Sequence, residues 1–202
     1  MPKPLFKLSR DPQKPRSDAD REGHVPDQSM ALSLNFYHKH CRRVQTIRDL
    51  VAGPPRPGEM YFLSTVKSFN AFTFVPYLLQ HREVIEELTI STFNINLRVL
   101  NSLMRLYHKG QVKKIFILVN ASVQKRLPKV YDQLMFHQRH HEAIEVRLAW
   151  NHSKITLIRT AEDYFVIEGS GNWSENAALE QYIFMNDAKV FSFRLNAVMK
   201  AE

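Results

Sequence analysis

Residues 151–173, with the sequence NHSKITLIRTAEDYFVIEGSGNW, predict a β-hairpin with a polar motif before its first strand and another after its second strand. The segments ITLIRT and YFVIEG alternate apolar and polar residues as β-strands do, and only AED separates them. A tight antiparallel hairpin brings the residues before its first strand and after its second strand to the same end. The segment therefore predicts that two polar motifs meet.

The two motifs, HSK at residues 152–154 and GSGN at residues 169–172, have the chemistry to hold a phosphate. Strand alternation points His152 and Lys154 to the same face. A neutral imidazole can attack phosphorus while a neighbouring ammonium stabilises charge on the non-bridging oxygens. The glycines permit a tight turn, and serine and asparagine offer donors to phosphate oxygens. Each motif is weak evidence alone, so the prediction depends on the ordered pair.

The chain before the hairpin alternates between strand-like and helix-like segments. In chain order we expect a strand at 59–66, a helix at 76–86, a strand at 87–95, a helix at 97–110, a strand at 112–119, a helix at 122–141 interrupted near Pro128, and a strand at 144–150. This alternation favours an α/β sandwich with a parallel or mixed sheet.

The N-terminal part of the chain has a different composition. Residues 1–30 contain too few apolar residues to offset their ordering entropy and are expected to form a flexible tail. Residues 31–57 predict a helix, which ends by residue 52, followed by a proline-rich linker. We expect the folded domain to comprise residues 58–202.

Composition restricts the partners and the cellular location. The 28 Lys and Arg residues outnumber 20 Asp and Glu residues, which gives a formal charge of +8 and favours a polyanionic partner. No apolar run reaches the length of a membrane span, and the N-terminal residues lack the apolar stretch of a secretory signal. A single cysteine, Cys41, gives no sign of an oxidising compartment, so a cytoplasmic protein without membrane contact is expected.

The ordered H-x-K and G-S-x-N motifs, joined by a hairpin, resemble the signature of the phospholipase D superfamily across roughly residues 58 to 190. The resemblance implies a phospholipase D-like α/β sandwich, with a mixed central sheet flanked by helices and one motif copy per chain. It also implies phosphodiester transfer that requires neither a metal nor a cofactor. In that reaction one histidine forms a phosphohistidine, and a second protonates the leaving group and then activates water.

Carried over to this sequence, the resemblance assigns a role to each motif residue. His152 is the expected nucleophile. The expected phosphate-binding residues are Lys154, Ser170 and Asn172.

Three residues beyond the second motif complete the predicted site. A carboxylate there is expected to orient an imidazole, and Glu180 is the candidate, with Glu175 as second choice. Trp173 either binds substrate by stacking on a base or packs beneath the turn.

The hairpin departs from the family pattern in length and at one position. Fourteen residues separate Lys154 from Gly169, and Arg159 stands where the family has an aspartate. Asp163, in the turn, is the candidate for the displaced aspartate. The departure leaves open a protein that binds phosphate without turnover.

One copy of the motif pair supplies one histidine, whereas the implied reaction needs two. A homodimer would supply the second, as in the small bacterial single-motif nucleases that the chain resembles. With the basic charge, this predicts a nuclease that acts on DNA or RNA. The alternatives are a catalytically silent nucleic-acid-binding or regulatory protein and, less favoured, a phospholipid-hydrolysing enzyme.

Overall fold

A computed structural model of the protein describes residues 38–44, 47–50, 53–65, 69–174 and 179–201. The tail predicted over residues 1–30 and the start of the predicted N-terminal helix lie outside the described residues. None of the described helices is both long and apolar enough to cross a membrane.

Eight described strands form one mixed sheet. In order across the sheet they are β1 (His38–Val44), β2 (Glu59–Thr65), β8 (Gln181–Asn186), β7 (Tyr164–Gly169), β6 (Ile155–Arg159), β3 (Ile85–Thr92), β4 (Val112–Asn120) and β5 (Ile144–Ala149). The pairs β1–β2, β3–β4 and β4–β5 are parallel, and the other neighbours are antiparallel. The predicted hairpin is confirmed as β6 and β7, which lie near the middle of the sheet.

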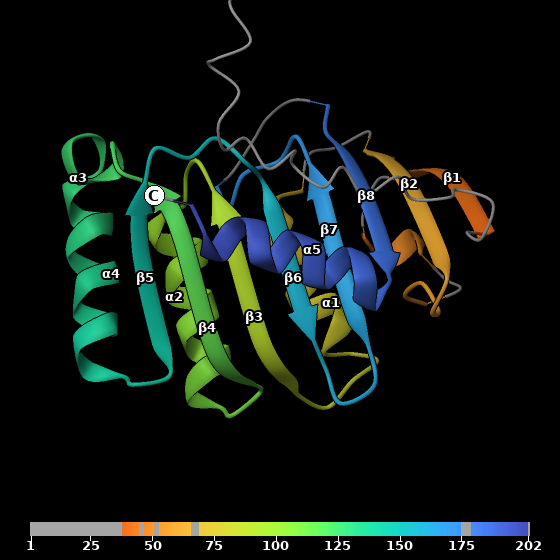
Figure 1. Ribbon diagram of the computed structural model, residues 1–202, viewed down its shortest axis with the longest axis horizontal. Helices are drawn as coiled ribbons and strands as arrows, with labels where there is room; N and C mark the ends of the chain where they lie inside the picture. The colour runs from red at the N-terminus through yellow and green to blue at the C-terminus, as the bar shows by residue number, and fades with distance from the viewer. Residues whose placement is uncertain (1–37, 45–46, 51–52, 66–68, 175–178, 202) are drawn as a thin grey trace, which may run out of the picture. The chain divides into compact units, whose positions relative to one another are not determined.

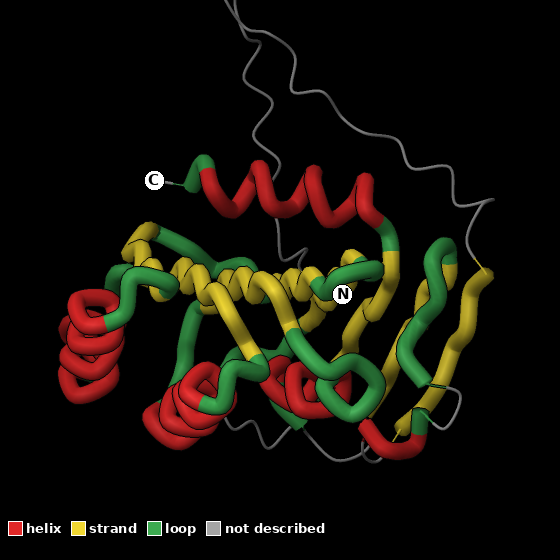
Figure 2. The backbone as a smooth tube through the Cα atoms, turned by 90° about the horizontal axis from the view of Figure 1, so that it is seen from below, coloured by secondary structure: helices red, strands yellow, loops and turns green. Residues whose placement is uncertain are grey.

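Helices cover both faces of the sheet (Figures 1 and 2). Of the described helices, one face carries α5 (Ala188–Met199) alone. On the other face lie α1 (Phe74–Leu78), α2 (Leu97–His108) and α4 (Pro128–His140), and the short helix α3 (Val123–Arg126) precedes α4. The expected α/β sandwich with a mixed sheet flanked by helices is therefore confirmed.

Each face of the sheet has its own core, which explains why the central strands are apolar in succession. Ile158 of β6 packs in the larger cluster beneath α1, α2 and α4, together with Phe74 and Leu100. The adjacent Leu157 points to the opposite face and packs with Phe191 of α5. Burial on both faces fixes the register of β6, because a shift by one residue would exchange the two sets of side chains.

The predicted N-terminal helix is wrong within the described residues, where residues 38–44 form β1. This strand pairs in parallel with β2 over seven residues, from His38 opposite Glu59 to Val44 opposite Thr65. The edge of β2 offers unpaired backbone groups, and pairing with them overrides a helical spacing that is only a weak local preference. The sheet consequently begins before residue 58.

Two further differences concern apolar segments. The helix predicted at 76–86 ends at Leu78, since the chain turns there and Ile85 already pairs with Val112 in the sheet. The sequence after the second motif gave no prediction of β8 or α5, although Asp187 caps α5 by accepting hydrogen bonds from the backbone of Lys189 and Val190. β8 lies between β2 and β7, so the strand order requires a long-range pairing.

Candidate active site

The hairpin brings the two polar motifs to one end of the sheet. Ile155 lies opposite Glu168 in the β6–β7 pairing, and Gly169 N donates to Lys154 O over 3.4 Å. A pocket of about 470 Å³ opens there. It is lined by His152, Ser153, Lys154, Ile155, Glu168, Gly169, Ser170 and Arg194. The predicted proximity of the motifs is therefore confirmed.

His152 and Lys154 lie side by side in this pocket. Lys154 Nζ is 3.5 Å from His152 Nδ1 and donates to the His152 carbonyl oxygen at 3.0 Å. Desolvation lowers the pKa of Lys154, and the nearby negative charge of Glu180 partly opposes this effect. The imidazole is exposed, so an incoming phosphate can reach it beside a cation.

Asn151 holds the first motif in place through hydrogen bonds of its buried side chain and its backbone. Its buried Nδ2 donates to Ser91 Oγ at 3.0 Å, and its Oδ1 accepts from Ser153 N at 2.9 Å and Ser153 Oγ at 2.8 Å. Asn120 Nδ2 donates to the Asn151 carbonyl oxygen at 2.7 Å. The ends of β3 and β4 thus fix the backbone next to His152. We did not identify Asn151 from sequence, and its only signal was a short polar side chain directly before the motif.

The second motif requires glycine because Tyr182 and its neighbour approach closely. A Cβ at Gly169 would overlap the backbone oxygen of Gln181, and one at Gly171 would overlap the phenol oxygen of Tyr182. Tyr182 Oη is fixed by donating to Phe69 O at 2.7 Å. Burial raises the pKa of Tyr182, and the negative charge of Glu180 raises it further by a smaller amount. The phenol therefore remains a neutral donor.

Ser170 is held by the residue that we predicted to orient an imidazole. Ser170 Oγ donates to Glu180 Oε2 and accepts from Gln181 N at 3.1 Å. Glu180 is buried, and its backbone oxygen and nitrogen both bond to Thr65 Oγ1. Its contact with Ser170 fixes the orientation of the Ser170 hydroxyl. The roles of Ser170 toward a phosphate and of Glu180 toward an imidazole stay predictions. Glu175 lies outside the described residues.

The other two residues predicted in this segment face inward. Asn172 Oδ1 accepts from Thr92 Oγ1 at 3.4 Å, which ties the turn to the end of β3. Trp173 is 1% exposed, and its Nε1 donates to Thr156 Oγ1 at 2.9 Å. The substrate-binding role predicted for Trp173 is wrong, because its ring packs in the core beneath the turn.

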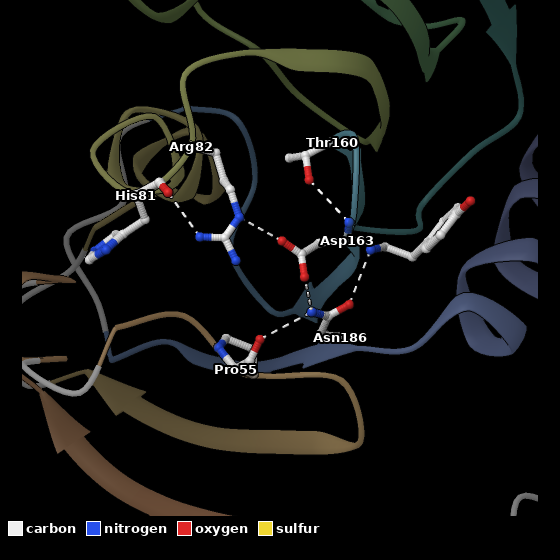
Figure 3. Close-up of polar contacts among 7 residues, drawn as sticks. Pro55, His81, Arg82, Thr160, Asp163 and Asn186 are labelled. Atoms are coloured by element: carbon white, nitrogen blue, oxygen red, sulfur yellow. Dashed lines mark hydrogen bonds and ion pairs between the residues drawn. The ribbon is translucent and has the colours of Figure 1, made fainter.

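The two candidates for the family aspartate position lie at the other end of the hairpin. Arg159, at the end of β6, pairs with Glu87 at 3.2 Å. Asp163 is buried and pairs with Arg82 at 2.6 Å while accepting from Asn186 Nδ2 at 2.6 Å (Figure 3). These contacts tie the hairpin turn to β8 and to the segment between α1 and β3, so Asp163 has a structural role here.

Arg194 adds a cation that sequence reasoning missed. It extends from α5 and holds both carboxylate oxygens of Glu168, with distances of 2.5 and 2.8 Å. Only the packing of α5 across β6 and β7 brings it to the pocket, so no local sequence signal could have found it. In the part of the chain that the structure describes, no three His, Cys, Asp or Glu side chains form a metal-binding group.

This combination of a mixed sheet between helices and a central hairpin flanked by HSK and GSGN defines a phospholipase D-like fold. Among solved structures, the fold is similar to polyphosphate kinase from Porphyromonas gingivalis, at 15% identity and a TM-score of 0.51. The match covers 69% of this chain and 25% of the kinase chain. The chain therefore corresponds to about a quarter of that enzyme.

Two other solved structures match with TM-scores below 0.5. Phosphatidylserine synthase from Haemophilus influenzae Rd KW20 has 15% identity and a TM-score of 0.48, over 70% of this chain and 38% of the synthase. The archaeal chromatin protein TrmBL2 has 14% identity and a TM-score of 0.43, over 71% and 51% respectively. No protein-family model and no curated protein matches the sequence.

Proposed function

We propose that the protein is a metal-independent phosphodiesterase that cleaves nucleic acid, with two protomers contributing one histidine each to a shared site. The carrying observation is that His152, Lys154 and Ser170 line one pocket at the end of the hairpin. An exposed imidazole, an adjacent ammonium and a fixed hydroxyl are the groups that nucleophilic attack on a phosphodiester requires.

The reaction proceeds in two displacements at phosphorus. An imidazole nitrogen of His152 attacks phosphorus, the bond to the leaving oxygen breaks, and a protonated imidazole from the second protomer gives that oxygen its proton. The second imidazole, now neutral, takes a proton from water, whose oxygen attacks phosphorus and releases His152. Lys154 stabilises the negative oxygens in both transition states, and Ser170 adds to this when its one hydroxyl proton turns from Glu180 Oε2 to a phosphate oxygen.

Charge favours nucleic acid as the substrate class. The chain carries a formal charge of +8, and Lys154 and Arg194 both line the pocket. Such cations gain free energy by releasing counterions from a polyphosphate backbone. Arg194 is held by Glu168 until a phosphate competes for the guanidinium, which prefers bidentate oxygen acceptors.

The experiment compares cleavage of labelled DNA and RNA in EDTA by the wild type, His152→Ala and His140→Ala. His140 is an exposed histidine on α4 and serves as the matched control. We expect EDTA-resistant cleavage, roughly 10³-fold or more slower after loss of the nucleophile, with His140→Ala unchanged. Binding without cleavage by all three proteins would instead support a catalytically silent nucleic-acid-binding protein.

The binding-only alternative rested on Arg159 at the family's aspartate position. Arg159 pairs with Glu87 at the end of β6 that lies away from the pocket. Its guanidinium therefore leaves the charge around His152 and Lys154 unchanged. This contact favours the catalytic proposal over the silent one.

A further inference from the structure

Trp150 is the most exposed large apolar side chain among the described residues. Its exposed fraction is 87%, whereas Trp173, the other tryptophan of the sequence, is 1% exposed. Trp150 is two residues before His152, so the two Cα atoms are at most about 7 Å apart. The backbone of an exposed tryptophan therefore lies close to that of the proposed nucleophile.

The backbone on both sides of Trp150 is fixed. Ala149 ends β5 and is buried, and its carbonyl oxygen accepts from Ala121 N at 2.8 Å. Asn151 is buried as well, and Asn120 holds its carbonyl oxygen. Because the neighbours are anchored, the backbone of Trp150 keeps its position without a loop having to order on binding. Such preorganisation reduces the entropy cost of binding.

The topology places further aromatic and cationic groups on the same edge. The parallel strands β3, β4 and β5 all end at the edge where β6 begins (Figure 1). Phe93 follows β3 and lies with its ring centroid 4.8 Å from that of His152. Arg126, in α3 after β4, lies 4.5 Å above the Phe93 ring. His152, Phe93 and Arg126 thus lie in succession at this edge, and we call these three residues the edge strip.

We propose that this edge binds a single strand of nucleic acid, with one phosphate in the pocket and an adjacent base stacked on Trp150. The inference rests on the proposed function and specifies its substrate class. An indole can stack on a base only where the base presents its face, which an unpaired strand does and a duplex interior does not. Arg126 is positioned for a neighbouring phosphate, and the strip would accept any base sequence.

The test uses His152→Ala protein, which retains the proposed binding site without turnover, and two probes of equal length. One probe is an oligothymidylate of about twelve nucleotides, and the other is an abasic deoxyribose-phosphate strand with the same charges. We expect the oligothymidylate to quench tryptophan fluorescence and to bind about 5- to 100-fold more tightly than the abasic strand. Adding Trp150→Ala should abolish the quenching by the oligothymidylate and its higher affinity over the abasic strand. Adding Trp150→Phe should retain most of the affinity for the oligothymidylate.

Phe136→Ala is the matched control, because Phe136 is an exposed aromatic residue on α4, 44% exposed, with no place on the edge strip. Equal affinity for both probes, or an unchanged preference in Trp150→Ala, would overturn the inference. So would sedimentation in which Trp150→Ala converts a dimer to monomers, since the indole would then belong to a subunit interface. Cleavage by the protein that retains His152 is measured separately and decides the proposed function independently.

Discussion

Lys154 combines charge with partial burial, which makes phosphate binding dependent on pH. Desolvation lowers its pKa from 10.5, against the opposing charge of Glu180. The ammonium binds phosphate only while protonated, so affinity is lost as pH rises through the lowered pKa. We expect oligonucleotide affinity of His152→Ala protein to fall at alkaline pH below 10.5. Lys154→Arg should move the fall to higher pH, because guanidinium stays protonated there. An identical profile for both proteins would assign the titration to another group.

Asn151 is a positioning residue whose removal should lower both stability and catalysis. Asn151→Ala leaves the Ser153 backbone N–H and the Ser91 hydroxyl without this partner. We expect a loss of about 1–3 kcal/mol in the free energy of unfolding, together with a lower kcat. Asn196→Ala, an exposed asparagine on α5, is the control and should stay within about 0.5 kcal/mol in urea denaturation. Full activity in a destabilised Asn151→Ala protein would limit the residue to a structural role.

Single residues differed in how far the sequence could place them. The two-residue period of a strand was sufficient to put His152 and Lys154 together, because that relation is local. The environment of a side chain is not local. The sequence therefore left open whether Trp173 stacks on a base or packs beneath the turn, and the structure shows that it is buried. The exposure of Trp150 was not predicted.

At the scale of elements, the turn of the hairpin is held by Asp163. Asp163→Ala would leave Arg82 and Asn186 without a common acceptor (Figure 3). We expect a loss of about 1–3 kcal/mol in unfolding free energy, since Arg82 is partly exposed and its ion pair is screened by solvent. The neighbouring exposed residue gives the control Glu162→Ala, expected to have little effect. Loss of cleavage at unchanged stability in Asp163→Ala would contradict the structural role.

The histidines at the end of α4 should make the stability of the fold sensitive to acid. Burial lowers the pKa of His137, and His141, His108 and His140 add repulsion when charged. The native state therefore holds His137 neutral, whereas the unfolded chain binds a proton near pH 6.5. Its contribution to stability is full above pH 6.5 and is lost as pH falls through the lowered pKa. In urea titrations from pH 7.5 to 5, His137→Phe should show a smaller fall in midpoint than the wild type. Equal falls would show that other groups cause the sensitivity.

Elements with their own periodicity were predictable, and those defined by a distant partner were not. The amphipathic α2 and the apolar β4 were predicted close to their observed bounds, because each carries its pattern in a continuous segment. β1 has few apolar residues and became a strand only because the edge of β2 was available for pairing. α1 ends at Leu78 because the chain turns there, before β3 begins at Ile85.

At the scale of the whole molecule, one motif copy predicts that activity depends on pairs of protomers. If two copies of His152 share each site, then protein reassembled from equal amounts of wild type and His152→Ala should retain about a quarter of the wild-type activity. Each mixed dimer would carry a single functional histidine. Activity that falls in direct proportion to the wild-type fraction would show that each protomer acts alone. Sedimentation of the same mixtures checks that dimers are present.

The sequence by itself determined the central hairpin, the meeting of HSK with GSGN and the α/β alternation, because all three depend on interactions between residues close in the chain. Only the tertiary structure decided that β8 lies between β2 and β7, that α5 brings Arg194 to the pocket, and that Asn151 anchors the motif. These features depend on pairings between segments far apart in the sequence. Their free energy comes from backbone pairing and burial on both sheet faces, which no local pattern encodes.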